Sequence, residues 1–142
     1  MKGVVDNMAF FNWEDSFSVG IREIDMQHQK LVQLLNELYE AMKAGKGNDA
    51  VGKILNGMVQ YTVSHFATEE RYMKLHNYPD FATHKQEHDS LTKQVVDLQE
   101  QFKTGQAALS MKVGNFLKGW LVNHISGTDM KYSPYLRAKG MK

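Results

Sequence analysis

The sequence has no cysteine, only two prolines, and no apolar run of the roughly 18 residues that a membrane-spanning helix needs. Without cysteine, the chain can form no disulfide, thiolate metal site or iron–sulfur cluster, so any metal must be held by His, Asp or Glu. An excess of one charge is also missing, because 17 Lys and Arg residues oppose 16 Asp and Glu residues, for a formal net charge of +1. We therefore expect neither nucleic acid nor a membrane surface as a partner, and we expect a cytoplasmic protein.

A repeating helical pattern runs through most of the chain. Apolar residues recur at alternating three- and four-residue spacing in four segments, as on the core-facing stripe of a helix. The stripe positions are Ile24, Leu31, Leu35, Leu38 and Met42; Val51, Leu55 and Met58; Leu91, Val95, Leu98 and Phe102; and Val113, Leu117 and Trp120. Four helices joined by short loops pack most simply as an all-α, up-down-up-down antiparallel four-helix bundle.

The 142 residues suffice for one domain with its own core. We predict an irregular N-terminal arm over residues 1–20, the four-helix bundle over residues 21–132, and a C-terminal tail over residues 133–142. No large exposed apolar stripe is evident, so we expect a monomer.

Five of the six histidines fall on the core-facing stripes, together with one glutamate. These residues are His28, His65, Glu69, His84, His88 and His124. A single histidine on an apolar stripe is more commonly a core residue bonded to a carbonyl. In an antiparallel bundle, however, the starts of the first and third helices meet the ends of the second and fourth, so all five imidazoles converge at one end. Unpaired buried imidazoles would cost about 1–3 kcal/mol each, a cost that a bound metal removes.

Two pairs of these residues have the spacing of metal ligands on one helix. His65 and Glu69 are four residues apart, and so are His84 and His88. Residues at this spacing share a helical face, so the side chains of each pair can reach a common ion.

A third pair, His124 and Asp129, has a different spacing. The two are five residues apart, about 140° around an ideal helix, so they need a local distortion, which Gly127 could permit. With Asp129 included, five imidazoles and two carboxylates exceed the four ligands of a tetrahedral zinc. Two octahedral metals that share both carboxylates and an oxo or hydroxo bridge would use the whole set and leave one position open.

Four stretches of the sequence match a known family. The motifs "VGIREIDMQHQKL", "HFATEE", "HKQEH" and "LVNHISGTD" resemble the ligand motifs of the hemerythrins, specifically the bacterial single-domain branch, the bacteriohemerythrins. The resemblance extends from about Trp13 to Tyr132. It implies a non-haem di-iron centre that binds O2 reversibly, for oxygen carriage, storage or delivery, in a protein that is not an enzyme.

The resemblance also implies a role for each candidate ligand. By this resemblance, one iron is bound by His84, His88 and His124, the other by His28 and His65, and the two irons are bridged by Glu69 and Asp129. The iron with two histidines carries the open position for O2.

Residues next to the ligands are expected to keep water from the O2 site. Phe66, Leu121 and Ile125 adjoin ligands, while Trp13 and Trp120 match positions where the family places aromatic pocket walls. All five could equally be ordinary core residues. Water or a proton reaching the bound oxygen would leave the iron oxidised, so an apolar wall favours reversible binding.

Three further polar residues invite a prediction. Tyr132, three residues after Asp129, could hydrogen-bond near the site. Glu70, next to Glu69, is expected to face solvent or to pair with a lysine. His76, in the "LHNYP" turn, lies off every stripe and is expected at the surface.

Other functions compete with oxygen binding. "HKQEH" fits the H-x-x-E-H signature of a zinc hydrolase, in which Glu87 would be the general base. Such an enzyme needs a distant acidic ligand and a substrate cleft, and it leaves His28, His65 and His124 unexplained. A module that senses O2, nitric oxide or redox state, and an iron-handling protein, would share the di-iron site. The partner would then be an oxygen-consuming enzyme or a sensor protein.

Overall fold

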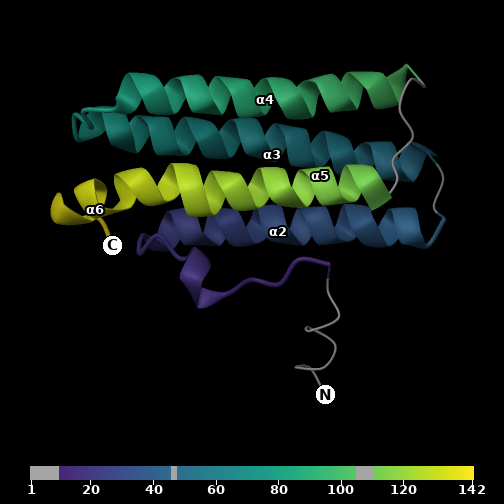
Figure 1. The fold of residues 1–142 in the computed structure, drawn as a ribbon, viewed down its shortest axis with the longest axis horizontal. Helices are drawn as coiled ribbons and strands as arrows, with labels where there is room; N and C mark the ends of the chain where they lie inside the picture. The colour runs from purple at the N-terminus through teal and green to yellow at the C-terminus, as the bar shows by residue number, and fades with distance from the viewer. Residues whose placement is uncertain (1–9, 46–47, 105–110) are drawn as a thin grey trace.

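The computed structural model describes residues 10–45, 48–104 and 111–142, and within these ranges the chain forms helices and turns and no strand. The long helices are α2 (Arg22–Lys43), α3 (Asn48–Leu75) and α4 (Phe81–Lys103), and the fourth segment of the bundle joins α5 (Met111–Val122), η2 (Asn123–Asp129) and α6 (Met130–Ala138). The four segments lie side by side and alternate in direction (Figure 1). The predicted all-α antiparallel bundle is therefore confirmed.

The core of the bundle is built from the predicted stripes. Leu35, Leu38, Leu55 and Leu117 are fully buried and belong to one apolar cluster that runs along the bundle axis. Burying a leucine side chain stabilises a fold by about 1.5–3 kcal/mol, so these residues hold α2, α3 and α5 together. Val95 adds a buried side chain from α4 to the same cluster. The side chain of Val113, also predicted for this core, lies outside the part of the chain that the structure describes.

The arm that precedes α2 is fixed to the outside of the bundle. It contains a short 3-10 turn, η1 (Asp15–Phe17). Nearer its start, the Phe11 backbone N–H donates to Asn36 Oδ1 at 2.8 Å, and Asn36 Nδ2 donates back to the Phe11 carbonyl at 2.9 Å. At its end, Asp25 accepts hydrogen bonds from the Ser18 hydroxyl (2.5 Å) and the Val19 backbone N–H (2.8 Å). These bonds attach the arm to α2 at two places.

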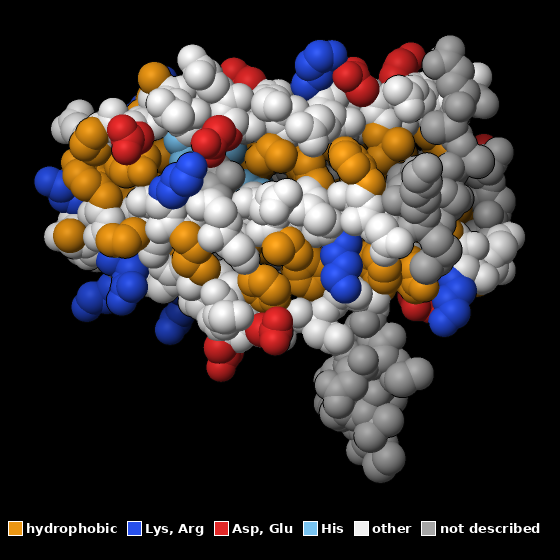
Figure 2. All heavy atoms as spheres, in the orientation of Figure 1, with side chains coloured by type: hydrophobic (Ala, Val, Ile, Leu, Met, Phe, Trp, Pro, Cys, Tyr) orange, Lys and Arg blue, Asp and Glu red, His pale blue; other side chains and the backbone are white. Residues whose placement is uncertain are grey.

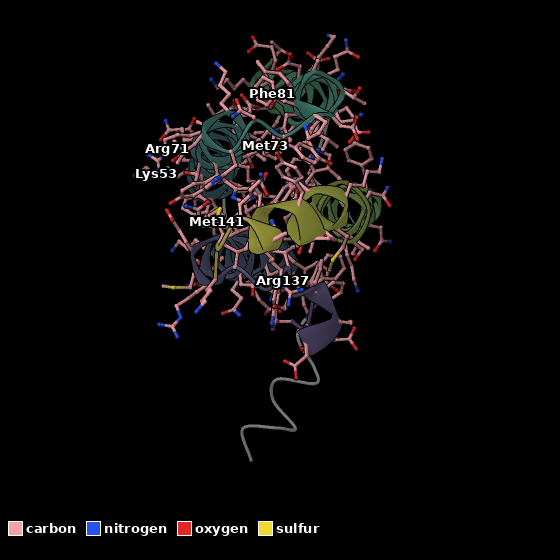
Figure 3. All side chains as sticks on the ribbon, turned by 90° about the vertical axis from the view of Figure 1, so that its left-hand side faces the viewer. Lys53, Arg71, Met73, Phe81, Arg137 and Met141 are labelled. Atoms are coloured by element: carbon pink, nitrogen blue, oxygen red, sulfur yellow. The ribbon has the colours of Figure 1, made fainter. Side chains whose placement is uncertain are left out.

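α6 and the end of the arm close one end of the bundle. A second apolar cluster, here called the end cap, contains Val19, Ile21, Ile24, Met73, Tyr78, Tyr132 and Leu136. Gly20 has a φ of +76°, which favours glycine, and a Cβ there would lie 2.8 Å from Arg137 Nε and displace the Arg137 side chain. In the end-on view, α6 lies across the end of the bundle, with Arg137 on the side of the arm (Figure 3).

The helix α6 continues past residue 132, where we placed the end of the bundle, to residue 138. The division of the chain into arm, bundle and tail stays a prediction. No helix in the described ranges has the length and apolar character required to cross a membrane.

Candidate metal centre

The seven candidate ligands converge at the capped end of the bundle. α2 provides His28, α3 provides His65 and Glu69, α4 provides His84 and His88, and η2 provides His124 and Asp129. All seven are buried. Their ligand-type atoms form two overlapping groups, each within 4.8 Å, and both groups contain Glu69 and Asp129. The sixth histidine, His76, lies outside both groups, in the turn between α3 and α4.

A π-helix brings the five-residue pair together. The segment η2 is a π-helix over Asn123–Asp129, so residues five apart share a face. His124 Nε2 consequently lies 2.9 Å from Asp129 Oδ2. The predicted distortion is present, but Gly127 is not required for it by packing, because its φ is not positive and a Cβ there would meet nothing within 4 Å.

The two oxygens of Glu69 face different histidines. Oε1 lies 3.0 Å from His88 Nε2 and 3.6 Å from His124 Nε2. Oε2 lies 3.4 Å from His65 Nε2 and 3.6 Å from His28 Nε2. Glu69 therefore stands between two sets of imidazoles, with one oxygen toward each set.

Asp129 also faces both sets of histidines, but it places His124 on the side of His28. Its Oδ1 lies 3.4 Å from His84 Nε2, while its Oδ2 lies 2.6 Å from His28 Nε2. His124 is close to this second oxygen, and its Nε2 is also 3.0 Å from that of His65. Each carboxylate thus offers one oxygen to each side of the centre, which is the arrangement that a bridging ligand needs.

Many polar atoms of the centre are buried without a partner. Within the described part of the chain, the buried side-chain atoms of the centre that lack a hydrogen-bond partner are His28 Nδ1, Glu69 Oε1, His84 Nε2, His88 Nε2, His124 Nδ1 and Asp129 Oδ1. Leaving such an atom unpaired costs about 1–3 kcal/mol. Nitrogen and oxygen ligands without sulfur suit ions such as iron or zinc. The residues present therefore fit a pair of metal ions.

Burial favours the neutral form of three imidazoles of the centre at ordinary pH. It lowers the pKa of His28, lowers that of His124 well below its usual value, and lowers that of His84 to about 4. Burial, and then the charge of Glu69, raise the pKa of Asp129 well above its usual value. A neutral imidazole keeps the lone pair that a metal requires.

Hydrogen bonds from outside the centre orient two of the histidines. His65 Nδ1–H donates to Gln27 Oε1 at 2.7 Å, and His88 Nδ1–H donates to Glu70 Oε2 at 2.8 Å. With the proton on Nδ1, each ring turns the lone pair of Nε2 toward the centre. Tyr132 also contacts the centre, since its buried hydroxyl donates to a carboxylate oxygen at 2.5 Å.

Sequence reasoning found only part of this outer layer. Tyr132 lies where we predicted, and the carboxylate that accepts its bond is Glu69. Glu70 does lie 3.7 Å from Lys85 Nζ, but its closer contact is to His88, which we did not predict. These bonds join different helices, and no spacing along one chain segment signals them.

The residues predicted to line the O2 pocket occupy two places. The Phe66 ring stacks on His88 at 4.0 Å between centroids, and Leu121 and Ile125 are fully buried in the same apolar cluster as Phe66. Trp120, also in this cluster, donates from Nε1 to the Leu91 carbonyl at 3.1 Å. These four walls stay predictions, as no bound O2 defines a pocket.

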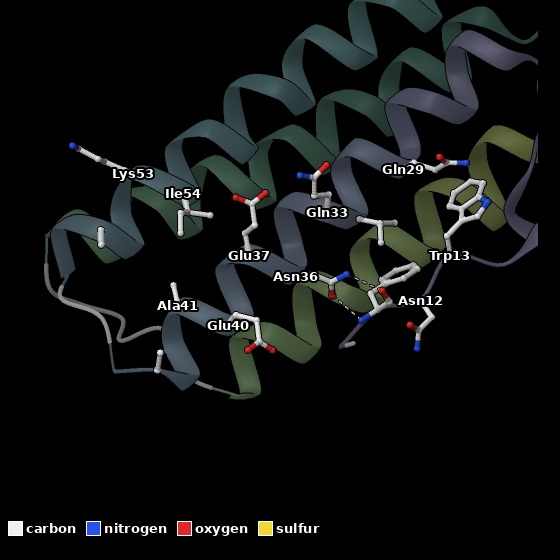
Figure 4. A pocket seen from close by; sticks show the side chains of 14 residues that line it. Asn12, Trp13, Gln29, Gln33, Asn36, Glu37, Glu40, Ala41, Lys53 and Ile54 are labelled. Carbon is white, nitrogen blue, oxygen red and sulfur yellow. Dashed lines mark hydrogen bonds between the residues drawn. The ribbon is translucent and has the colours of Figure 1, made fainter. Parts of the chain in front are cut away.

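Trp13 lies farther out. It packs against Phe17, with ring centroids 5.7 Å apart, and lines a surface groove of about 1110 Å³ between the arm and the helices α2 and α3 (Figure 4). Gln29, Gln33 and Asn36 line the same groove. The role of Trp13 as a wall of the O2 pocket also stays a prediction.

Glu87, the general base of the zinc-hydrolase alternative, is not a member of either ligand group. Its Oε1 lies 3.4 Å from Lys131 Nζ at the surface. His84 and His88 instead share a group with both Glu69 and Asp129. The geometry therefore does not favour the hydrolase.

Comparisons with known proteins agree with this geometry. Residues 19–136 match the family model described as the hemerythrin HHE cation binding domain. The chain is 37% identical over 131 residues to bacteriohemerythrin from Stenotrophomonas maltophilia (strain R551-3), an alignment that covers 92% of this chain and 84% of the relative. It is 36% identical over 132 residues to bacteriohemerythrin from Methylococcus capsulatus, covering 92% of this chain and all 100% of the relative. A solved structure of wild-type hemerythrin superposes with a TM-score of 0.83 at 36% identity, covering 90% of this chain and 98% of that one.

Proposed function

This chain belongs to the hemerythrin family, and from that premise we propose that it holds two iron ions and binds O2 reversibly, for oxygen carriage, storage or delivery. The observation that carries the proposal is the pair of overlapping ligand groups that share both carboxylates. A protein with this role is a binding protein and not an enzyme. Its partners are O2 and an oxygen-consuming enzyme or a sensor protein that receives it.

We assign the histidines to the two irons by the faces of Glu69. The oxygen nearest His88 is also near His124, whereas the other oxygen faces His65 and His28. The ligand groups separate His84 and His88 from His28 and His65. His124 lies between the two sets, because its Nε2 is 3.6 Å from Glu69 Oε1 and 2.9 Å from Asp129 Oδ2. By the resemblance to the hemerythrins, we place His124 with His84 and His88 on one iron and leave His28 and His65 on the other. Glu69 and Asp129 would then bridge the pair.

When bound, such a di-iron centre supplies two electrons that can pass to O2 and return. The protein determines which of its side chains bind the metals and in which protonation state. Because burial lowers the pKa of His28, His84 and His124, these imidazoles bind without first losing a proton at neutral pH. Gln27 and Glu70 hold two further rings in the orientation that points Nε2 at the metals.

The protein also keeps water away from the O2 position. Phe66 covers His88 and also lies against His124, with ring centroids 4.8 Å apart. Leu121 and Ile125 extend this wall with fully buried side chains. An apolar wall admits O2, which is small and uncharged, and disfavours water and anions, whose transfer into such surroundings costs free energy. This selection is what reversible binding needs.

The test is an anaerobic reduction followed by exposure to O2, with metal analysis and a visible absorption spectrum before and after removal of the gas under vacuum. We expect two irons per chain and an absorption band that appears with O2 and disappears under vacuum. His76→Ala, outside the centre, should behave as the wild type, whereas His28→Ala should lose iron. Zinc alone, or iron that oxidises without a reversible band, would overturn the proposal.

A further inference from the structure

One edge of the metal centre approaches the protein surface. His84 and His88 are 3% and 1% exposed, whereas the other five candidate ligands are 0% exposed. Figure 2 shows histidine atoms in the seam between α4 and the α5 to α6 segment, with acidic and basic side chains beside them. The histidines of α4 are therefore the candidate ligands that lie nearest to solvent.

An ion pair spans the same seam. Glu87, which lies on α4 between His84 and His88, has its Oε1 3.4 Å from Lys131 Nζ on α6. Its Oε2 is buried and has no hydrogen-bond partner among the described residues. Glu87 directly precedes the candidate ligand His88 on α4, so its carboxylate lies beside the metal centre.

Glu70, the other carboxylate beside the α4 histidines, differs in this respect. One of its oxygens accepts a hydrogen bond from His88, and the other lies 3.7 Å from Lys85 Nζ. Both oxygens of Glu70 therefore have partners within the protein. Glu87 keeps one oxygen unpaired at the inner side of the seam, while the Lys131 side chain, 63% exposed, holds the other from outside.

We propose that Glu87 determines which ligands reach the metals: it repels anions along this seam and lets uncharged O2 pass, and Lys131 positions it. This inference rests on the proposed function, because it concerns the ligands of the same centre. An anion that reached the open position would take the place of O2 there. A carboxylate in a partly buried seam is screened by salt less than a carboxylate on open surface, so its repulsion acts at the point of passage.

The charge predicts a difference between two probes, azide for anions and O2 for neutral ligands. Glu87→Gln keeps the shape of the side chain and removes its charge. We expect the rate at which azide associates with the diferric protein, followed by stopped-flow absorption, to rise about three- to tenfold in this variant. Its dependence on ionic strength should become flatter. The association rate of O2 with the diferrous protein should change less than about twofold, because O2 carries no charge.

Asp97→Asn is the matched control. Asp97 is also on α4 and forms an exposed ion pair with Lys93 at 2.9 Å, so its substitution removes the same charge from the same helix, away from the seam. We expect no change in either rate. An equal rise in the azide rate in both variants would overturn the proposal, since the effect would then come from net charge.

A charge swap separates repulsion from simple closure of the seam. Glu87→Lys combined with Lys131→Glu restores an ion pair and reverses the charge that faces the centre. Under the proposal, azide associates with the swapped protein faster than with the wild type, as it does with Glu87→Gln. An association rate equal to that of the wild type would overturn the proposal. Iron content and the melting temperature of the metal-free protein should match the wild type in Glu87→Gln, which keeps the test valid if the swap folds poorly.

The two proposals fail in distinguishable ways. A wild-type protein that binds no iron, or shows no reversible O2 band, would overturn the proposed function and this inference with it. A wild type that passes that test, with azide rates that do not differ between wild type and Glu87→Gln, would overturn the inference alone.

Discussion

The interior of the bundle has an apolar half and a polar half, and the two are equally buried but differently held. In the apolar half, Leu35, Leu55 and Leu117 are fully buried and contact other carbon side chains. In the polar half, Glu69 and Asp129 are just as inaccessible and lie among five imidazoles. The first half gains stability from burial itself, at about 25 cal/mol per Å² of apolar surface.

The polar half gains nothing comparable from burial. Six of the seven buried atoms without a partner, among the described residues, belong to the candidate ligands. Each costs about 1–3 kcal/mol until something binds it. The comparison teaches that equal burial does not mean equal stabilisation: the polar half depends on its ligand, and the apolar half does not.

Metal loading should give the largest effect, because it acts on the polar half alone. Iron at about 1,000 times its dissociation constant should raise the free energy of unfolding by about 4 kcal/mol. The measurement is chemical denaturation under anaerobic conditions, with and without iron. Asp129→Asn, which keeps the size of the side chain and removes its charge, should lose most of this gain. A wild type equally stable with and without iron would contradict the comparison.

Two leucines test where the boundary between the halves lies. Leu35→Ala and Leu121→Ala each leave a cavity and should lower the free energy of unfolding by about 2–5 kcal/mol, with or without iron. Leu121 lies in the cluster next to Phe66, so its truncation should also admit water and speed autoxidation of the oxygenated form. Unfolding curves and the decay of the O2-dependent band measure the two effects. Equal autoxidation rates in the two variants would exclude Leu121 as a gate.

Acid should destabilise the metal-free protein through the polar half. Burial lowers the pKa of His84 from 6.5 to about 4. The unfolded chain therefore binds more protons than the folded one between these values. The contribution of His84 is complete above pH 6.5 and is lost as the pH falls toward 4, by about 3 kcal/mol in all. The free energy of unfolding, measured by denaturation at several pH values in this range, should depend less on pH in His84→Gln than in the wild type. An unchanged dependence on pH would argue against a neutral buried His84.

The smallest effect is expected at Gly127. A Cβ there meets no atom within 4 Å, so Gly127→Ala should stabilise the protein by about 0.5–1 kcal/mol through reduced freedom of the unfolded chain. Iron content should stay the same. Loss of iron in this variant would show that the π-helix needs glycine after all, and would give this exposed position a role in the polar half.

Much of the fold and of the candidate centre could be predicted because both follow helical periodicity. The core stripes and the convergence of the five histidines depend only on spacing and on antiparallel packing. The five-residue interval between His124 and Asp129 indicated a local distortion, which the structure shows to be a π-helix. In each case one segment of sequence carries the whole signal.

Contacts between segments could not be predicted in the same way. Gln27 and His65 are 38 residues apart, and Glu70 and His88 are 18 apart, on different helices. Whether such side chains meet depends on the rotation of each helix about its axis, which the pattern fixes only roughly. The end cap is a similar case, because the packing of α6 on the arm depends on Gly20 and on the position of the preceding helix.

The π-helix sets the angular phase of everything that follows it. Each residue of an α-helix turns the chain by about 100°, and η2 absorbs additional residues without the corresponding rotation. Asp129 then faces the centre, Tyr132 reaches Glu69, and Leu136 enters the end cap. If the same residues were wound as a regular α-helix, all three side chains would rotate together about the helix axis. The π-helix therefore sets the direction of the side chains in both the metal centre and the end cap, and a change in its winding would alter both.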